Sequence, residues 1–114
     1  MPVRRGEIYW FDLPQGVGTE QGGRRPVLVI QNDLGNLASP STIVASVTSR
    51  PRRRLYPFHV RFSAAESGLR LDGTVLCEQI DTVDKSQLGA RAGELPPARM
   101  LEIDDALRWS LGLN

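Results

Sequence analysis

Apolar residues fall into short runs along the chain, and most of these runs have the composition of β-strands. The segment 26–30 (PVLVI) is continuously apolar, as in a strand buried on both faces. In the segment 58–62, apolar residues alternate with polar ones, which is typical of a strand exposed on one face. The predicted strands cover residues 6–13, 26–30, 42–48, 58–62, 74–83 (as one or two strands) and 88–95.

The C-terminal segment has helical periodicity instead. Its apolar stripe consists of Met100, Ile103, Leu107 and Leu111. Pro97 at the beginning and Gly112 at the end predict a helix over residues 97–111, with the stripe in the core or a subunit interface. Short helical turns are predicted at 63–68 and 84–87, and residues 35–41 are turn-like. The predicted fold is a small, strongly bent antiparallel sheet or partly open barrel that carries a C-terminal helix.

Length and composition are those of one globular domain that spans residues 1–114. Hydrophobic residues make up 40% of the chain and charged residues 24%. No apolar run reaches the ~20 residues of a membrane span, and the N-terminal segment has no signal-peptide pattern, so we expect a cytoplasmic protein. One His and one Cys do not supply a zinc ligand set, so we expect no metal site.

A glycine-rich polar loop, residues 14–24, lies between the first two predicted strands. Its spacing GxGxxxG is one residue longer than the dinucleotide fingerprint, and a strand follows it instead of a helix. The chain contains neither the GK[ST] of a nucleoside triphosphate loop nor the GxSxG of a serine nucleophile. The loop therefore predicts neither a nucleotide-cofactor site nor a serine nucleophile, and its polar side chains must be considered individually.

Several types of polar side chain stand at the ends of the predicted strands. Thr19 and Glu20 lie in the glycine-rich loop, Arg25 directly precedes the buried strand, Thr48 ends the third strand, and Gln79 follows the fifth. An Arg with neighbouring hydroxyl groups is a receptor for phosphate, because the guanidinium neutralises charge and the hydroxyls donate to oxygens. The alternative for Arg25 is a structural role in which it binds loop carbonyls.

A second polar loop, residues 49–57, combines cationic and aromatic side chains. It contains Arg50, Arg52, Arg53 and Arg54, followed by Tyr56 and then Phe58. Such a combination suits single-stranded nucleic acid, which offers phosphates to the arginines and bases to the rings. A solvated run of charge is the alternative.

Five segments, taken in order, resemble the MazF/PemK ribonuclease toxins. They are RGEIYWFDL, GTEQGGRRPVLVIQND, TIVASVT, PFHV and EQIDTVD. The resemblance implies an SH3-like barrel of the CcdB/PemK type and a homodimer. It also implies cleavage of single-stranded RNA at short sequences, without a metal or other cofactor. The implied protein partner is a cognate antitoxin, whose acidic, disordered C-terminal segment would fold over the basic loop and mask the site.

The resemblance also assigns roles to individual residues. Arg25 and Thr48 match the central catalytic pair of the family, Thr19 and Glu20 the loop residues beside it, and Gln79 an RNA contact. Thr19 stands where close relatives often carry Ser, so the hydroxyl is retained with an added methyl group.

Without a metal, the expected reaction is attack by a ribose 2′-OH on its own 3′-phosphate. Arg25 and Thr48 would stabilise the charge that develops on the phosphate oxygens. Three candidates remain for the general base, because Arg stays protonated: Glu20, a phosphate-bound water, and His59. A lone His on the polar face of a strand, such as His59, is more often structural.

Two other functions fit the same pattern. One is a non-catalytic toxin of the same fold that binds a protein target such as gyrase, with its contacts on the C-terminal helix. The other is an RNA-binding module that does not cleave its ligand.

Overall fold

The computed structural model describes residues 2–12 and 24–113 as one six-stranded antiparallel sheet with short helices and one long C-terminal helix. The strands are β1 (Glu7–Asp12), β2 (Arg24–Val29), β3 (Ser41–Thr48), β4 (His59–Phe62), β5 (Gly73–Asp84) and β6 (Leu88–Glu94). The helices are α1 (Asp33–Ala38), α2 (Ala64–Ser67), the 3₁₀ turn η1 (Lys85–Gln87) and α3 (Pro97–Leu111).

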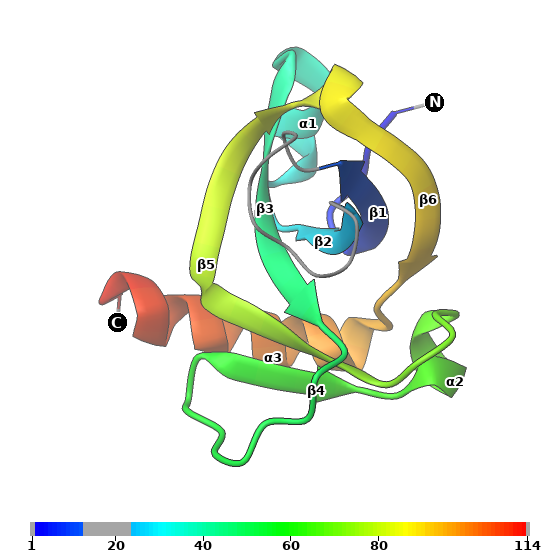
Figure 1. The fold of residues 1–114 in the computed structure, drawn as a ribbon. Coiled ribbons are helices and arrows are strands. Elements are labelled where there is room, and N and C mark those ends of the chain that lie inside the picture. The colour runs from blue at the N-terminus through cyan, green and yellow to red at the C-terminus, as the bar shows by residue number, and fades with distance from the viewer. Residues whose placement is uncertain (1, 13–23, 114) are drawn as a thin grey trace.

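The sheet bends strongly around its core. Its strand order is β4-β5-β3-β2-β1-β6, so β4 and β6 are the two edges and the sheet does not close into a full barrel. In Figure 1 the long strand β5 turns sharply between its two halves, and α3 lies across the end of the sheet near β4. The predicted partly open barrel with a C-terminal helix is confirmed.

Helix α3 closes the larger of the two hydrophobic clusters that the described residues form. Ile103 and Ala106 are buried against β4 and β5, while Met100 and Leu107 are partly buried against the same cluster. Leu111, the last residue of the predicted stripe, is instead 51% exposed. The helical stripe therefore reaches the core only over its first three positions.

A short helix, α1, occupies most of the segment that was predicted to be turn-like, so that prediction was wrong. The side chain of Asn32 caps the helix by accepting a hydrogen bond from the Gly35 backbone N–H at 2.8 Å. Asn36 is buried, and its side-chain oxygen accepts a bond of 2.6 Å from the Thr42 hydroxyl. The helix is thus held by buried polar contacts that a search for apolar periodicity does not detect.

All six strands differ from their predicted bounds by one or two residues. β2 begins at Arg24, two residues earlier than predicted, because Arg24 and Arg25 continue the antiparallel pairing with β1. Residues 73–84 form the single strand β5, which is one of the two alternatives that the sequence left open.

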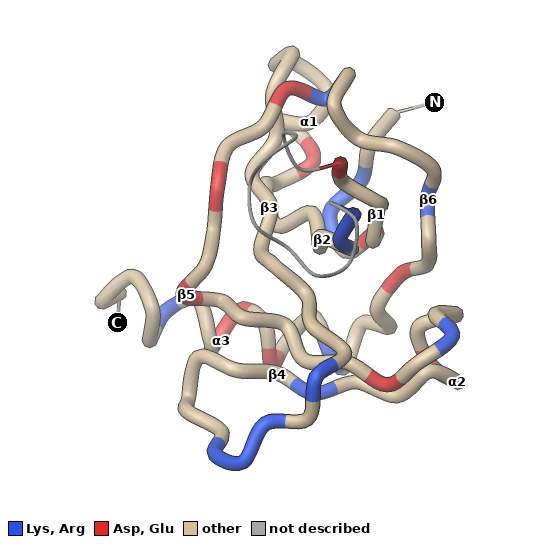
Figure 2. Tube along the Cα trace, viewed as in Figure 1, with Lys and Arg blue, Asp and Glu red and all other residues tan. Residues whose placement is uncertain are grey.

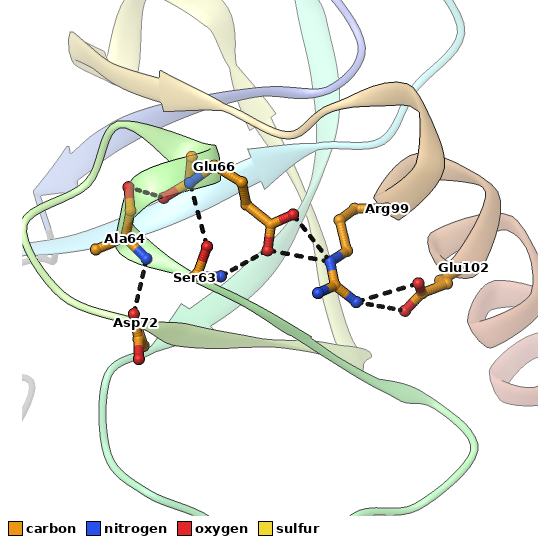
Figure 3. Close-up of polar contacts among 7 residues, drawn as sticks. Ser63, Ala64, Glu66, Asp72, Arg99 and Glu102 are labelled. Carbon is orange, nitrogen blue, oxygen red and sulfur yellow. Dashed lines mark hydrogen bonds and ion pairs between the residues drawn. The ribbon is translucent and has the colours of Figure 1, made fainter.

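Helix α2 is connected by hydrogen bonds to the segment before β5 and to helix α3 (Figure 3). Ser63 and Glu66 form a capping box at its N-terminus, and the Glu66 carboxylate also accepts two hydrogen bonds from the Arg99 Nε of α3, at 3.1 and 3.2 Å. The Asp72 carboxylate accepts a hydrogen bond of 2.7 Å from the Ala64 backbone N–H. These contacts fix both ends of the segment 64–72, and its residues 69–72 form one wall of a groove.

Candidate functional site

A groove of about 980 Å³ opens at the end of the sheet where β2 begins and β3 ends. Its walls come from β1, β2, β3, the arginine loop (residues 49–57), the end of β4, the segment 69–72 and β5. The lining residues are Trp10, Arg24, Arg25, Pro26, Val47, Thr48, Ser49, Arg50, Pro51, Arg52, Phe62, Leu69, Arg70, Leu71, Asp72, Gly73, Leu76 and Gln79. The groove thus brings together Arg25, Thr48 and Gln79. For Arg25 and Thr48 this convergence was predicted from the ends of the strands.

Arg25 and Thr48 lie on neighbouring strands. The β2–β3 ladder ends at the pair Val27–Ser46, and the same antiparallel register continued by two residues leads to Arg25 and Thr48. Because side chains two residues apart share a face of a strand, both side chains extend from the face that carries Val27 and Ser46. The Thr48 hydroxyl oxygen accepts a hydrogen bond of 3.1 Å from the Arg50 backbone N–H, which leaves its own proton for a second partner.

Gln79 reaches the groove from inside β5, not from the end of a strand, so its predicted position was wrong. The β3–β5 register shifts between Ala45 and Ser46, where residues 77–79 of β5 have no counterpart on β3. Such an irregularity bends the strand and re-aims its side chains. Gln79 is exposed at this bend and lines the groove.

The arginine loop contributes only part of its charge to the groove. Arg50 and Arg52 line it, whereas Arg53 and Arg54 are exposed beyond its lining. Within the described residues, the buried Nε of Arg52 has no hydrogen-bond partner. The run of cationic residues projects from the body of the molecule below β4 in Figure 2.

Tyr56, Phe58 and His59 form an aromatic cluster outside the groove lining. The Tyr56 and Phe58 rings are parallel with centroids 5.2 Å apart, and the His59 ring stands edge-on to both. Nδ1 of His59 accepts a hydrogen bond of 3.3 Å from the Tyr56 backbone N–H, and its Nε2 lies 3.4 Å from a Glu78 carboxylate oxygen. With its side chain only 4% exposed, His59 has the surroundings of a structural residue.

Trp10 and Arg24 are among the groove residues that the sequence prediction missed. The guanidinium carbon of Arg24 lies 4.5 Å from the centroid of the Trp10 ring, above its face. Trp10 was assigned only to a strand and Arg24 only to a loop. Their proximity depends on the pairing of β1 with β2, in which Asp12 lies opposite Arg24 and Trp10 opposite Pro26. The alternation of side chains along both strands is the signal that would have found them.

Thr19 and Glu20, predicted beside the phosphate receptor, lie outside the described residues.

In residues 2–12 and 24–113, no group of three His, Cys, Asp or Glu side chains is placed to hold a metal ion. None of the described helices is both long and apolar enough to cross a membrane.

The model of one protein family matches residues 4–111, and its description is PemK-like, MazF-like toxin of type II toxin–antitoxin system. This chain is a member of that family. The toxin is 46% identical over 113 residues to Endoribonuclease EndoA of Bacillus subtilis (strain 168), with 99% of this chain and 97% of that protein aligned. The family resemblance seen in the sequence is confirmed.

Solved structures agree with this assignment. The toxin superposes with a TM-score of 0.80 on a mycobacterial endoribonuclease that was solved in complex with its cognate antitoxin, at 30% identity over 98% of this chain and 97% of that one. It superposes with a TM-score of 0.78 on a MazE–MazF structure from Deinococcus radiodurans, at 28% identity over the whole of both chains. The toxin therefore has the fold of the MazF structures, as predicted.

Proposed function

We propose that this toxin is an endoribonuclease that cleaves single-stranded RNA at short sequences, without a metal or other cofactor. The observation that supports this most strongly is the convergence of Arg25 and Thr48 in one groove at the ends of neighbouring strands. The endoribonucleases named among its relatives, one of them 46% identical, point to the same reaction.

The proposed reaction is an internal transfer of the phosphodiester. The ribose 2′-oxygen forms a bond to the adjacent phosphorus as its proton passes to a base, and the bond from phosphorus to the 5′-oxygen breaks as that oxygen gains a proton. The products are a 2′,3′-cyclic phosphate and a 5′-OH. Arg25 would donate to the nonbridging oxygens through its planar fork, and Thr48 through the hydroxyl proton that the Arg50 contact leaves available.

The general base is the open part of this mechanism. Glu20 and a phosphate-bound water remain the candidates, because a guanidinium does not lose its proton and His59 is enclosed by Tyr56 and Glu78. Gln79 would contact the RNA from the bend in β5.

We further propose that the toxin acts as a cytoplasmic homodimer of single-domain subunits and is inhibited by a cognate antitoxin. Among the described residues, five arginines line the groove, Arg24, Arg25, Arg50, Arg52 and Arg70, against one carboxylate, Asp72. A groove of this charge suits an acidic, disordered segment that folds on binding and excludes RNA. The relatives solved as complexes with an antitoxin support such a partner.

Incubating the purified toxin with a long single-stranded RNA, and mapping the ends that form, tests the proposed activity. We expect cuts at one recurring short sequence and none where that sequence is paired in a duplex. Binding without cuts would instead support an RNA-binding module. If the protein neither binds nor cuts the RNA, that result would favour a toxin that acts on a protein such as gyrase.

Replacing Arg52, Arg53 and Arg54 together with Ala should weaken RNA binding without slowing the cleavage of RNA that is already bound. Each lost phosphate contact removes about 0.7 from the slope of log affinity against log salt, so three contacts account for about 2. The saturating single-turnover rate should change little, because the transferred phosphate contacts Arg25 and Thr48 instead. Affinity measured from low to moderate salt checks this, and an unchanged slope would mean that the arginine loop is only a solvated charge run.

A further inference from the structure

The stacked pair of Trp10 and Arg24 has the form of a platform for a nucleic-acid base. We infer that Arg24, supported from below by Trp10, stacks on the base of a nucleotide adjoining the scissile phosphate and so helps to determine which RNA sequence is cut. This inference rests on the proposed function, since it names a specificity residue for the same groove.

Trp10 lies at the boundary between the core and the groove. On β1 it lies two residues from Ile8, so the two side chains share a face of the strand. Ile8 is completely buried in the larger hydrophobic cluster, whereas Trp10 is half-buried and lines the groove. The indole thus continues the core surface outward and presents an aromatic face where RNA would pass.

Arg24 lies on that aromatic face. Its guanidinium carbon is 4.5 Å from the centre of the Trp10 ring, within the range of a favourable cation–π contact. The residue itself is exposed, and among the described residues its guanidinium has no hydrogen-bond or ion-pair partner. A guanidinium stacked on an indole has little freedom to turn, and its second face is suited to a base, since bases stack on arginine planes as well as on rings.

The position of Arg24 relates the platform to the chemistry. Arg24 directly precedes Arg25 on β2, so consecutive residues of one strand would hold a base and the reacting phosphate. Both residues line the same groove, and their side chains leave β2 on opposite faces of the strand. Arg52, in contrast, lines it without a stacked ring among the described contacts, which suits it to a phosphate rather than to a base.

Stacking depends on the area of the ring system rather than on its hydrogen-bonding edge. We therefore expect the platform to favour a purine over a pyrimidine at one position of the cleavage sequence.

An abasic scan tests this inference. The probe is an oligonucleotide taken from the mapped cleavage sequence, with 2′-deoxyribose at the scissile nucleotide so that it binds without being cut. Each of its bases is removed in turn, and affinity is measured for the wild-type toxin and for Arg24→Lys, which keeps the charge but lacks the planar fork. In the wild type, removing the stacked base should weaken binding about tenfold. In Arg24→Lys that penalty should disappear at this one position and persist elsewhere.

Two further variants complete the test. Trp10→Leu should remove the penalty at the same position, because the guanidinium then has no support. Arg61→Lys is the matched control, an identical change at an exposed residue of β4 outside the groove lining, and its scan should equal that of the wild type. An unchanged scan in Arg24→Lys, with wild-type cleavage intact, overturns this inference alone. A wild-type toxin that cuts no RNA overturns the proposed function and this inference with it.

Discussion

Replacing Arg25 with Ala is expected to reduce RNA cleavage by at least ~100-fold while leaving the fold and most of the RNA affinity intact. The loss of one preorganised donor to a developing charge typically has this effect on the rate. Arg25 is half-buried at the start of a strand whose following residues, Val27 to Val29, are buried in the core. The side chain is therefore held in place before RNA binds, and its removal leaves that core untouched.

Single-turnover rates with saturating toxin measure this loss without interference from product release. Arg61→Ala, at an exposed position outside the groove lining, is the matched control and should cleave at the wild-type rate. Thermal unfolding of both variants should give midpoints close to that of the wild type. If Arg25→Ala keeps more than about a tenth of the wild-type rate, Arg25 is a structural residue and the proposed mechanism is wrong.

Replacing Thr48 with Val should reduce the cleavage rate by about 100-fold, since it removes the second donor while preserving the shape of the side chain. The change also removes the oxygen that accepts the 3.1 Å hydrogen bond from the Arg50 backbone N–H, so RNA affinity should fall as well. Thr48→Ser retains the hydroxyl and should restore most of the rate.

The comparison of these two Thr48 variants separates chemistry from loop structure. The saturating rate and the affinity are measured for each of them. A Val variant that loses affinity but keeps its saturating rate would limit Thr48 to holding the arginine loop.

The elements that the sequence predicted are those whose signal is local. The continuous apolar run of β2 and the alternation in β4 are visible in five residues each, and they depend on burial alone. Helix α1 was missed for the opposite reason: Leu34 and Leu37 are exposed, and the helix is held by the cap of Asn32 and the buried amide of Asn36. A short helix stabilised by polar contacts leaves no apolar stripe in the sequence.

The site was predictable where it depends on strand ends and unpredictable where it depends on register. Arg25 and Thr48 stand at the ends of clearly patterned strands, so their convergence followed from an antiparallel sheet. The orientation of Gln79 depends on a shift in the β3–β5 register, which no local pattern encodes. Trp10 and Arg24 are in contact only because β1 pairs with β2. The register of that pairing is not encoded by either strand alone, so the contact became visible only in the structure.

The chemistry of the newly formed RNA ends, determined in the presence of EDTA, tests the central claim most directly. The account predicts undiminished cleavage, with a 2′,3′-cyclic phosphate on the upstream fragment and a free 5′-OH on the downstream one. Attack by the 2′-OH requires these ends, because the 5′-oxygen is the leaving group. A 5′-phosphate on the downstream fragment, or cleavage that stops in EDTA and returns with magnesium, would contradict it, since both indicate attack by metal-activated water.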